Sequence, residues 1–169
     1  NIDARIQSEV VKINRVQKTI TVKNILTGDL YEESYDHLVL SPGASPIVPN
    51  IEGVNGKHVF TVRNVTDIEK LNHYIQTTDA KNIAVIGGGF IGVEVAENLR
   101  LAERNVSLVE FAPQILMPFD YDMVQILHKE MVDKGIELIV GDGLAKIEET
   151  SISLNSGKVL DADIVVLAI

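Results

Sequence analysis

Three glycines in a fixed spacing are the first residues in this sequence that could bind a ligand. Gly87, Gly89 and Gly92 follow the apolar run 83–86, and a helical pattern begins at Phe90. Gly87 allows a tight turn, Gly89 lets the backbone approach a pyrophosphate, and Gly92 lets the helix lie close to the strand. The helix N-terminus would add unpaired N–H groups and a partial positive charge. The motif therefore predicts a dinucleotide-binding turn.

The first helical residues and one acidic residue complete the candidate site. Phe90 and Ile91 carry the first amides of that helix N-terminus. Glu110 ends the next apolar run, at about the 20-residue spacing from Gly87 that such a motif requires. A carboxylate there accepts hydrogen bonds from a ribose and repels a 2′-phosphate. The site is therefore predicted to bind NAD(H) in preference to NADP(H), unless Arg104 swings across and neutralises the phosphate.

Apolar periodicity predicts the elements that hold this site. Residues 83–86 and 106–109 are continuous apolar runs, as expected for parallel strands buried on both faces. A helix joins them, and a second helix is expected after a loop that contains two prolines. The residues predicted to face the core are Ile91, Val95, Leu99 and Ala102 on the first helix, and Val124, Leu127 and Met131 on the second.

Capping and turn residues predict where the other elements begin and end. An earlier helix is expected from an N-cap at Thr66, with Glu69 completing a capping box, to about Thr77. Asp120 or Asp122 is expected to cap the later helix, and Gly135 suits the position just after it. The remaining predicted elements are a parallel strand over 136–140, an antiparallel meander over 144–161 and a buried strand over 164–169.

The first forty residues predict a β ribbon. Strand patterns cover 10–13, 19–23 and 30–35, and residues 37–40 are apolar enough for a buried strand. Proline and glycine then interrupt the pattern, so we expect a boundary within 41–60. Because the ribbon and its apolar run resemble the later part of the chain, the sequence indicates the end of one dinucleotide-binding unit followed by nearly all of another.

The bulk composition describes a folded chain and argues against several kinds of partner. Of 169 residues 46% are hydrophobic, yet no apolar run approaches the ~18 residues that a membrane span needs. The net charge of −9 argues against nucleic acid and membrane surfaces as partners. The absence of cysteine excludes thiol chemistry here and agrees with a cytoplasmic setting. Because the chain does not begin with Met, we expect a piece of a longer protein.

Four segments together resemble the pyridine nucleotide-disulfide oxidoreductases, in particular the branch of coenzyme A-disulfide reductases and NADH oxidases. The segments that carry this resemblance are 35–44 (YDHLVLSPGA), 60–64 (FTVRN), 87–94 (GGGFIGVE) and 163–169 (DIVVLAI). The resemblance implies an α/β, Rossmann-like FAD/NAD(P)-binding fold of three layers. In that fold a parallel sheet has helices on one side and an antiparallel β-meander on the other. A β-rich remnant of a second such domain would precede it.

The same resemblance implies roles for individual residues. Residues 57–169 would be the NAD(H)-binding domain, and 1–52 the C-terminal part of a flavin-binding domain. Phe90 would be an aromatic gate over the flavin, and Glu94 would lie near the nicotinamide carboxamide. The three residues expected near the flavin nucleotide are Ser41, Pro42 and Gly43.

The resemblance also implies a reaction that this chain would not complete alone. Hydride would pass from NADH to FAD and then to a redox-active cysteine outside this chain. We therefore expect FAD only in the full-length parent, which would be a homodimer through a domain absent here. The fragment by itself is expected to be inactive.

Other interpretations of the same residues stay open at this point. Phe90 could be a core aromatic, Glu94 a solvated helix charge and Glu110 an ordinary strand-end acid. The four histidines have no ligand spacing and are expected at the surface or its boundary, and the three methionines are expected to be packing residues. The glycine-rich turn could also belong to an S-adenosylmethionine-binding methyltransferase or to a non-catalytic nucleotide-sensing module.

Overall fold

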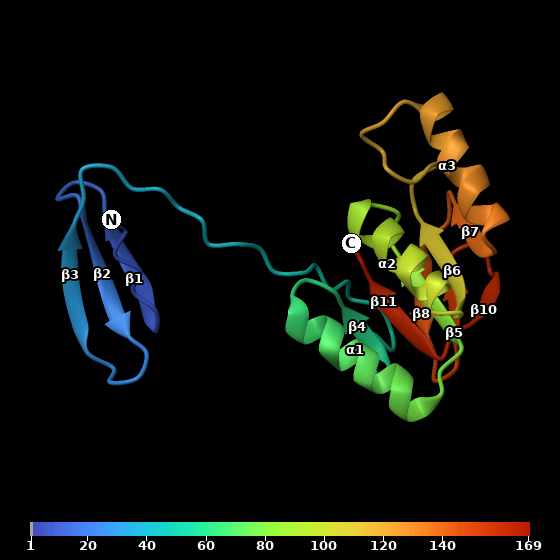
Figure 1. The fold of residues 1–169 in the computed structure, drawn as a ribbon, viewed down its shortest axis with the longest axis horizontal. Helices are drawn as coiled ribbons and strands as arrows, with labels where there is room; N and C mark the ends of the chain where they lie inside the picture. Colours follow the sequence, from blue (N-terminus) through green and yellow to red (C-terminus); the bar gives the residue numbers. More distant parts are fainter. Residues whose placement is uncertain (1) are drawn as a thin grey trace. The chain divides into compact units, whose positions relative to one another are not determined.

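The chain forms two compact units in the computed structural model, which describes residues 2–169 (Figure 1). The first unit is Asn1–Gly43 and the second is Ala44–Ile169. The first contains a three-stranded antiparallel sheet. The second contains a five-stranded parallel sheet and another three-stranded antiparallel sheet.

The first unit is the β ribbon that the sequence predicts. Strands β1 (Ser8–Asn14), β2 (Thr19–Asn24) and β3 (Leu30–Ser34) pair antiparallel in that order. Val22, on the central strand, is the hydrophobic side chain that this unit buries among the residues described. Most other apolar side chains of the sheet are exposed or half-buried.

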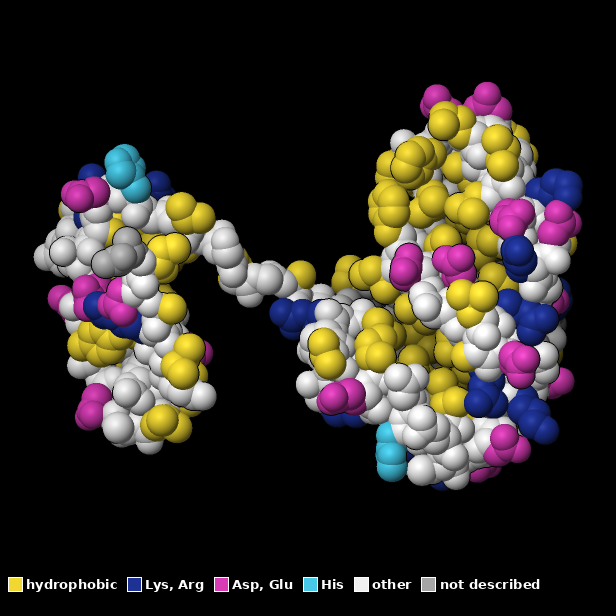
Figure 2. All heavy atoms as spheres, viewed as in Figure 1, with side chains coloured by type: hydrophobic (Ala, Val, Ile, Leu, Met, Phe, Trp, Pro, Cys, Tyr) yellow, Lys and Arg dark blue, Asp and Glu magenta, His cyan; other side chains and the backbone are white. Residues whose placement is uncertain are grey.

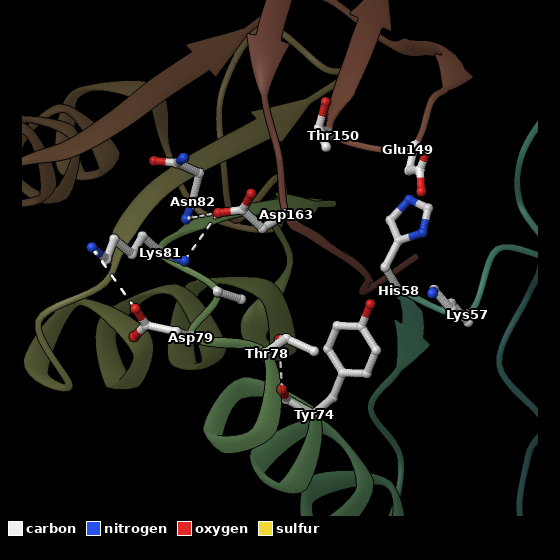
Figure 3. A pocket seen from close by; sticks show the side chains of 11 residues that line it. Lys57, His58, Tyr74, Thr78, Asp79, Lys81, Asn82, Glu149, Thr150 and Asp163 are labelled. Carbon is white, nitrogen blue, oxygen red and sulfur yellow. Dashed lines mark hydrogen bonds and ion pairs between the residues drawn. The ribbon is translucent and has the colours of Figure 1, made fainter.

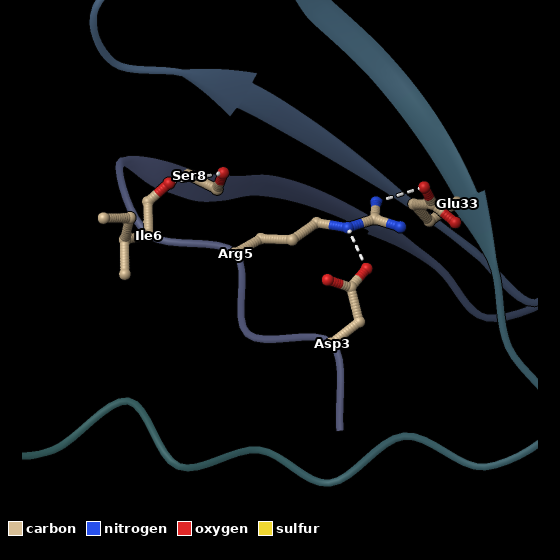
Figure 4. Close-up of polar contacts among 5 residues, drawn as sticks. All are labelled: Asp3, Arg5, Ile6, Ser8 and Glu33. Carbon is tan, nitrogen blue, oxygen red and sulfur yellow. Dashed lines mark hydrogen bonds and ion pairs between the residues drawn. The ribbon is translucent and has the colours of Figure 1, made fainter. Parts of the chain in front are cut away.

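Arg5 joins the segment before β1 to strand β3 (Figure 4). Its Nε donates a hydrogen bond to Asp3 at 2.9 Å, and its guanidinium also contacts the carboxylate of Glu33. The contact with Glu33 is the main reason that the pKa of Arg5 lies above its usual value. Because these side chains are about half exposed, water screens the ion pairs and they add little to stability.

The buried strand expected over residues 37–40 is wrong. These residues adopt no regular structure, and the side chains of Val39 and Leu40 are 86% and 65% exposed. An apolar strand needs hydrogen-bonded neighbours on both sides of a sheet to become buried. Within residues 2–169 no strand pairs with this segment.

The second unit places five parallel strands in the order β4-β11-β5-β6-β7, beside a meander in the order β10-β9-β8. This agrees with the predicted parallel strand over 136–140, the meander over 144–161 and the final buried strand. Its elements are β4 (Val59–Thr61), α1 (Val65–Thr78), β5 (Asn82–Ile86), α2 (Phe90–Leu101), β6 (Asn105–Glu110), α3 (Tyr121–Asp133), β7 (Ile136–Val140), β8 (Leu144–Ile147), β9 (Ser151–Leu154), β10 (Val159–Asp161) and β11 (Ile164–Leu167).

The parallel sheet separates two hydrophobic cores, which confirms the three-layer fold. Alternate residues of a strand point to opposite faces, so β5 sends Ile83 and Val85 to one core and Ala84 and Ile86 to the other. The first core lies under the three helices, and the second lies between the sheet and the meander. Burial on both faces explains why these strands are continuous apolar runs.

Helix α2 buries only part of the face predicted for it: Leu99 is buried and Val95 is partly buried, as expected. Gly92, Ala96 and Leu99 are its buried residues, whereas Ile91 is 53% exposed and Ala102 lies past the helix end. Two small residues one turn apart allow the helix axis to approach the sheet closely, so the buried face is centred on them. Periodicity alone favoured the larger side chains.

Helix α3 begins and ends close to the prediction. Asp120 is its N-cap residue by position, although its side chain makes no capping hydrogen bond, and Gly135 follows the helix with φ +83°. Val124 and Met131 are buried and Leu127 is partly buried. None of the helices described in residues 2–169 is long and apolar enough to cross a membrane.

Helix α1 starts two residues earlier than predicted, and the expected cap at Thr66 is wrong. The side chain of Asn64 accepts a hydrogen bond from the amide of Asp67 at 3.0 Å. Asp67 accepts one in return from the amide of Asn64 at 3.3 Å. This is the reciprocal arrangement of a capping box, with amide and carboxylate in place of hydroxyl and glutamate.

If Asn64 is the N-cap, replacing it should destabilise the chain; if Thr66 is the N-cap, replacing Thr66 should do so instead. Asn64→Ala should lower the free energy of unfolding by about 1 kcal/mol, because the amide of Asp67 loses its acceptor. Thr66→Ala is the matched control and should change it by less than about 0.5 kcal/mol. Urea denaturation of both variants measures the difference, and a larger loss for Thr66→Ala would restore the original assignment.

Candidate functional site

The glycine-rich turn lies at the carboxyl end of β5, where the chain enters α2. Strand β5 sits between β11 and β6, so the turn is flanked by the carboxyl ends of both neighbours. Open parallel sheets bind ligands at this edge, where the connections leave in opposite directions from adjacent strands. The sequence motif therefore stands at the place where this fold can use it.

Each glycine of the motif meets a different steric requirement. Gly87 has φ +109°, which L-residues with side chains rarely adopt. A Cβ on Gly92 would lie 1.8 Å from the carbonyl oxygen of Gly87, so only hydrogen fits between helix and turn. A Cβ on Gly89 would meet no atom within 4 Å. The first and third glycines shape the turn, and the second keeps its outer surface open.

The N-terminus of α2 has no side-chain cap. Its N-cap residue is Gly89, whose carbonyl accepts from the amide of Val93 at 3.0 Å, and the first turn carries no acidic residue. The amides before Val93, including those of Phe90 and Ile91, have no intrahelical acceptor. A helix end with free amides and a partial positive charge suits an anion.

Glu110 holds its carboxylate beside the glycine-rich turn. One oxygen accepts the amide of Gly88 at 2.5 Å and the other accepts the amide of Ala112 at 2.6 Å. A carboxylate has about four lone-pair sites, so two stay available for the hydroxyls of a ribose. The acid is thus fixed at the turn and still able to bind a ligand.

Arg104 cannot neutralise a phosphate near Glu110. It precedes β6, whereas Glu110 ends that strand, so the two lie roughly 20 Å apart along it at ~3.3 Å per residue. The Arg104 guanidinium donates to the carbonyl of Ala80 at 3.1 Å, on the amino side of β5. The exception allowed for in the sequence prediction is therefore ruled out by geometry.

The loop between β6 and α3 contributes to the site, which the sequence did not reveal. The amide of Leu116 donates to the carbonyl of Gly88 at 2.8 Å, and the side chain of Ile115 is fully buried. A Cβ on Gly88 would lie 2.6 Å from a methyl of Ile115. The sequence contains one indication that this loop packs inward, namely apolar Ile115 and Leu116 between two prolines. A loop has no periodic pattern from which its contacts could be predicted.

A small cavity of about 210 Å³ lies over the turn. The residues that line it are Gly88, Gly89, Phe90, Glu110, Leu116, Met117 and Pro118. Free amides, an anchored carboxylate and a surface open at Gly89 fit the pyrophosphate and ribose of a dinucleotide. We therefore consider the site able to hold NAD(H).

Exposed apolar side chains surround this cavity. Figure 2 shows hydrophobic side chains gathered over the loop between β6 and α3. Phe90 is 64% exposed, with its ring 6.0 Å from that of Phe119 between centroids, so it is not a core aromatic. Met117 and Met123 are also more than half exposed, and of the three methionines only Met131 is a buried packing residue.

The remaining predicted site residues are not part of this cluster. Glu94 is exposed on α2, one turn after Phe90. Ser41, Pro42 and Gly43 belong to the first unit and lie in a segment without regular structure. The structure thus brings together the residues of the glycine-rich turn, the start of α2 and Glu110.

A second, polar cavity of about 550 Å³ lies near the amino ends of β5 and β11, away from the glycine-rich turn (Figure 3). His58 lines it and is only 8% exposed, so its predicted surface position is wrong; its Nε2 lies 3.0 Å from the carbonyl oxygen of Glu148. The carboxylate of Asp163 accepts the amides of Lys81 and Asn82 at 3.0 and 2.8 Å. The carboxylate of Asp163 thus holds the start of β11 beside the start of β5. Nowhere in residues 2–169 do three His, Cys, Asp or Glu side chains gather to hold a metal ion.

The profile of the pyridine nucleotide-disulphide oxidoreductase family matches residues 1–169. The chain belongs to this family. An NADH oxidase of Methanocaldococcus jannaschii is 36% identical over 99% of this chain. The chain spans only 38% of that relative's length.

Solved structures agree with this membership. Reduced CoADR-RHD of Bacillus anthracis is 48% identical with a TM-score of 0.86, over 96% of this chain and 30% of that one. The water-forming NADH oxidase of Lactobacillus brevis, bound to NADH, is 30% identical with a TM-score of 0.80. That match covers 96% of this chain and 36% of the oxidase.

The steric roles of the glycines predict unequal effects on stability. Gly92→Ala should lower the free energy of unfolding by about 1–3 kcal/mol, because the new methyl group collides with backbone at Gly87. Gly89→Ala adds its methyl to open space and should cost less than about 1 kcal/mol through weaker capping. Thermal or urea denaturation compares them. Equal losses would mean that the helix does not approach the turn as closely as described.

Proposed function

We propose that residues 57–169 bind NADH and hold it for hydride transfer to FAD in a larger flavoprotein oxidoreductase. Residues 1–52 would then form the C-terminal part of its flavin-binding domain. Family membership and the NADH-bound relative support the cofactor assignment. Because the chain spans about a third of its relatives, the activity of the whole protein is part of this proposal.

One observation carries the proposal. The uncapped N-terminus of α2 and the carboxylate of Glu110 flank the open position at Gly89. The amides of Phe90 and Ile91 would bind the pyrophosphate, and the free lone pairs of Glu110 would accept the ribose hydroxyls. An anion donor set beside a hydroxyl acceptor is what a pyridine dinucleotide requires.

Two residues of α2 would act at the nicotinamide end. Glu94 would accept a hydrogen bond from the carboxamide and orient the ring. Phe90, already exposed beside the cavity, would cover the place where the ring meets the flavin and exclude water from it. When both are bound, NADH would supply the hydride and FAD would receive it. This chain's contribution is to bind the dinucleotide and fix its direction.

The flavin would be held mainly by residues outside this chain. Ser41, Pro42 and Gly43 would lie near its nucleotide, but within residues 2–43 the structure describes strands and loops without a helix N-terminus. These residues alone do not fit a flavin pyrophosphate, so we assign them no step. The parent would carry the redox-active cysteine and form a homodimer through another domain, and its cytoplasmic location stays a prediction.

The alternative functions have less support. Family membership does not favour an S-adenosylmethionine-binding methyltransferase. A nucleotide-sensing module would bind the same dinucleotide without passing hydride to a flavin. Reduction of FAD by NADH in the whole protein, measured by loss of flavin absorbance, separates the sensing role from the proposed one.

Gly89→Val should abolish NADH binding and leave the fold intact. A branched side chain there would enter the space between the bound pyrophosphate and the free amides. Calorimetric titration with NADH measures the affinity, and circular dichroism checks the fold. Ala145→Val, at an exposed position on β8, is the matched control and should bind as well as the unchanged chain.

Three outcomes of the titration would count against the assignment. The first is a folded Gly89→Val variant with unchanged affinity, which would move the site away from this turn. The second is an unchanged chain that binds no NADH at all. Loss of binding in both valine variants would show only a general sensitivity to larger side chains and would also count against the site.

The fixed carboxylate of Glu110 should make NADH the preferred cofactor. A 2′-phosphate carries about 1.5–2 negative charges at neutral pH. Two like unit charges at ~4 Å repel by about 4 kcal/mol at an effective dielectric constant of ~20. Solvent screening and movement should reduce this to about 1–3 kcal/mol, or roughly ten- to a hundredfold in affinity.

Removing the charge should narrow this preference. Glu110→Gln keeps the volume, and Glu110→Ala removes the side chain; both also lose hydrogen bonds to the turn, so absolute affinities should fall. The ratio of the NADPH to the NADH dissociation constant is therefore the quantity to measure, at low and moderate salt. Glu69→Ala, an equal change of charge on exposed α1, should leave the ratio unchanged. If both Glu110 variants keep the ratio of the unchanged chain, another residue selects NADH over NADPH.

A further inference from the structure

His128 on α3 is connected to the glycine-rich turn through the loop between β6 and α3. Its Nε2 accepts a hydrogen bond from the amide of Ile115 at 3.3 Å. The next amide, that of Leu116, donates to the carbonyl of Gly88 at 2.8 Å. The amide of Gly88 itself donates a hydrogen bond to the carboxylate of Glu110. The histidine thus fixes the loop that contacts the centre of the turn.

Burial and backbone hydrogen bonds also hold the loop at this point. Ile115 is fully buried in the core under the helices, and Leu116 adopts φ +47°, a conformation that side-chain-bearing residues rarely take. Gln114 bonds within the loop, to the carbonyl of Phe119 at 3.0 Å. Among these side-chain contacts, the one from His128 is the bond that joins the loop to a helix.

The elements around His128 carry both apolar and charged side chains. Its neighbours one turn away on α3 are Val124, Gln125, Met131 and Val132, and β6 and β7 face the same core with Leu108, Leu138 and Val140. Burial is the sole cause that lowers the pKa of His128 below its usual value. The charged groups on the elements packed around it are Glu97 and Arg100 on α2, Lys129, Glu130, Asp133 and Lys134 on α3, Asp120 and Asp122 at the start of α3, Glu110 on β6 and Glu137 on β7.

We propose that His128 is a positioning residue for the dinucleotide site, acting in its neutral form through Ile115, Leu116 and Gly88. It touches no part of the cavity itself. A neutral imidazole accepts the Ile115 amide, whereas a protonated one has only donors and faces that N–H with another. Protonation therefore releases the loop, and the carbonyl of Gly88 loses its fixed donor. This inference rests on the proposed function of the site.

The direction in which pH changes dinucleotide affinity follows from the fact that only neutral His128 can accept the hydrogen bond. Above the usual histidine pKa of about 6.5 the bond is complete, and affinity should not depend on His128. As the pH falls below that value and through the lowered pKa, the loop is released and dinucleotide affinity falls. The folded state also binds fewer protons than the unfolded chain in this window, so stability declines in the same direction.

The test is the dissociation constant of NAD⁺, which tolerates acid better than NADH, for the full chain between pH 8 and pH 5.5. The unchanged chain should lose affinity toward the acid end of this range, approaching about three- to tenfold, the equivalent of one neutral hydrogen bond, as His128 becomes fully protonated. His128→Gln offers an amide oxygen that does not titrate. This variant should therefore keep its NAD⁺ affinity at acid pH, and its plot of affinity against pH should be flat. His128→Ala should bind more weakly at every pH, also with a flat profile.

His73→Gln is the matched control, because His73 is exposed on α1 and should keep the profile of the unchanged chain. A histidine with a merely structural role would change stability without changing the shape of the affinity profile. An equal pH dependence in the unchanged chain and His128→Gln would overturn the proposal, as would a flat profile in the unchanged chain.

A second measurement separates failure of this inference from failure of the cofactor assignment. In the free chain, amide resonances of Ile115, Leu116 and Gly88 should titrate together with His128, below pH 6.5, and should stay constant in His128→Gln. Absence of this shared titration would overturn the positioning role whether or not the chain binds NAD⁺. Shared titration without any NAD⁺ binding at pH 8 would refute the proposed function and keep the coupling.

Discussion

The close contact between Gly92 and the carbonyl of Gly87 is the constraint on which the site depends. It brings the first turn of α2 against the end of β5, so that the free amides of the helix stand over the edge of the parallel sheet. Burial of Ala96 one turn later continues the same approach. A larger residue in place of either glycine would separate helix and strand, and the proposed anion-binding position would move with the helix.

Gly88 connects this contact to the rest of the unit. Its amide bonds to the acid at the end of β6, and its carbonyl accepts an amide from the loop before α3. The glycine-rich turn, the end of β6 and the loop before α3 therefore meet at one residue. Because each uses backbone groups of Gly88, a change in any segment alters the same surface, on which the dinucleotide is proposed to lie.

The local parts of this arrangement could be predicted from the sequence, and the contacts between loops could not. Continuous apolar runs, glycine spacing and a terminal acid are periodic or regularly spaced features, so residues 83–110 were predicted in order. The amides of Ile115 and Leu116, which bond to His128 and Gly88, lie in a loop without periodicity, so no sequence pattern indicates these bonds. The cap at Asn64 was missed because two capping boxes overlap in that sequence. The strand expected over 37–40 was wrong, since hydrophobicity alone does not supply a neighbouring strand.

The most direct test of a dinucleotide site at the glycine-rich turn is to map NADH binding on the full chain by amide resonances. We expect saturable changes concentrated at Gly88, Gly89, Phe90, Ile91 and Ala112, with the polar cavity near the amino ends of β5 and β11 unaffected. Changes confined to that second cavity, or no saturable change at millimolar NADH, would contradict the account.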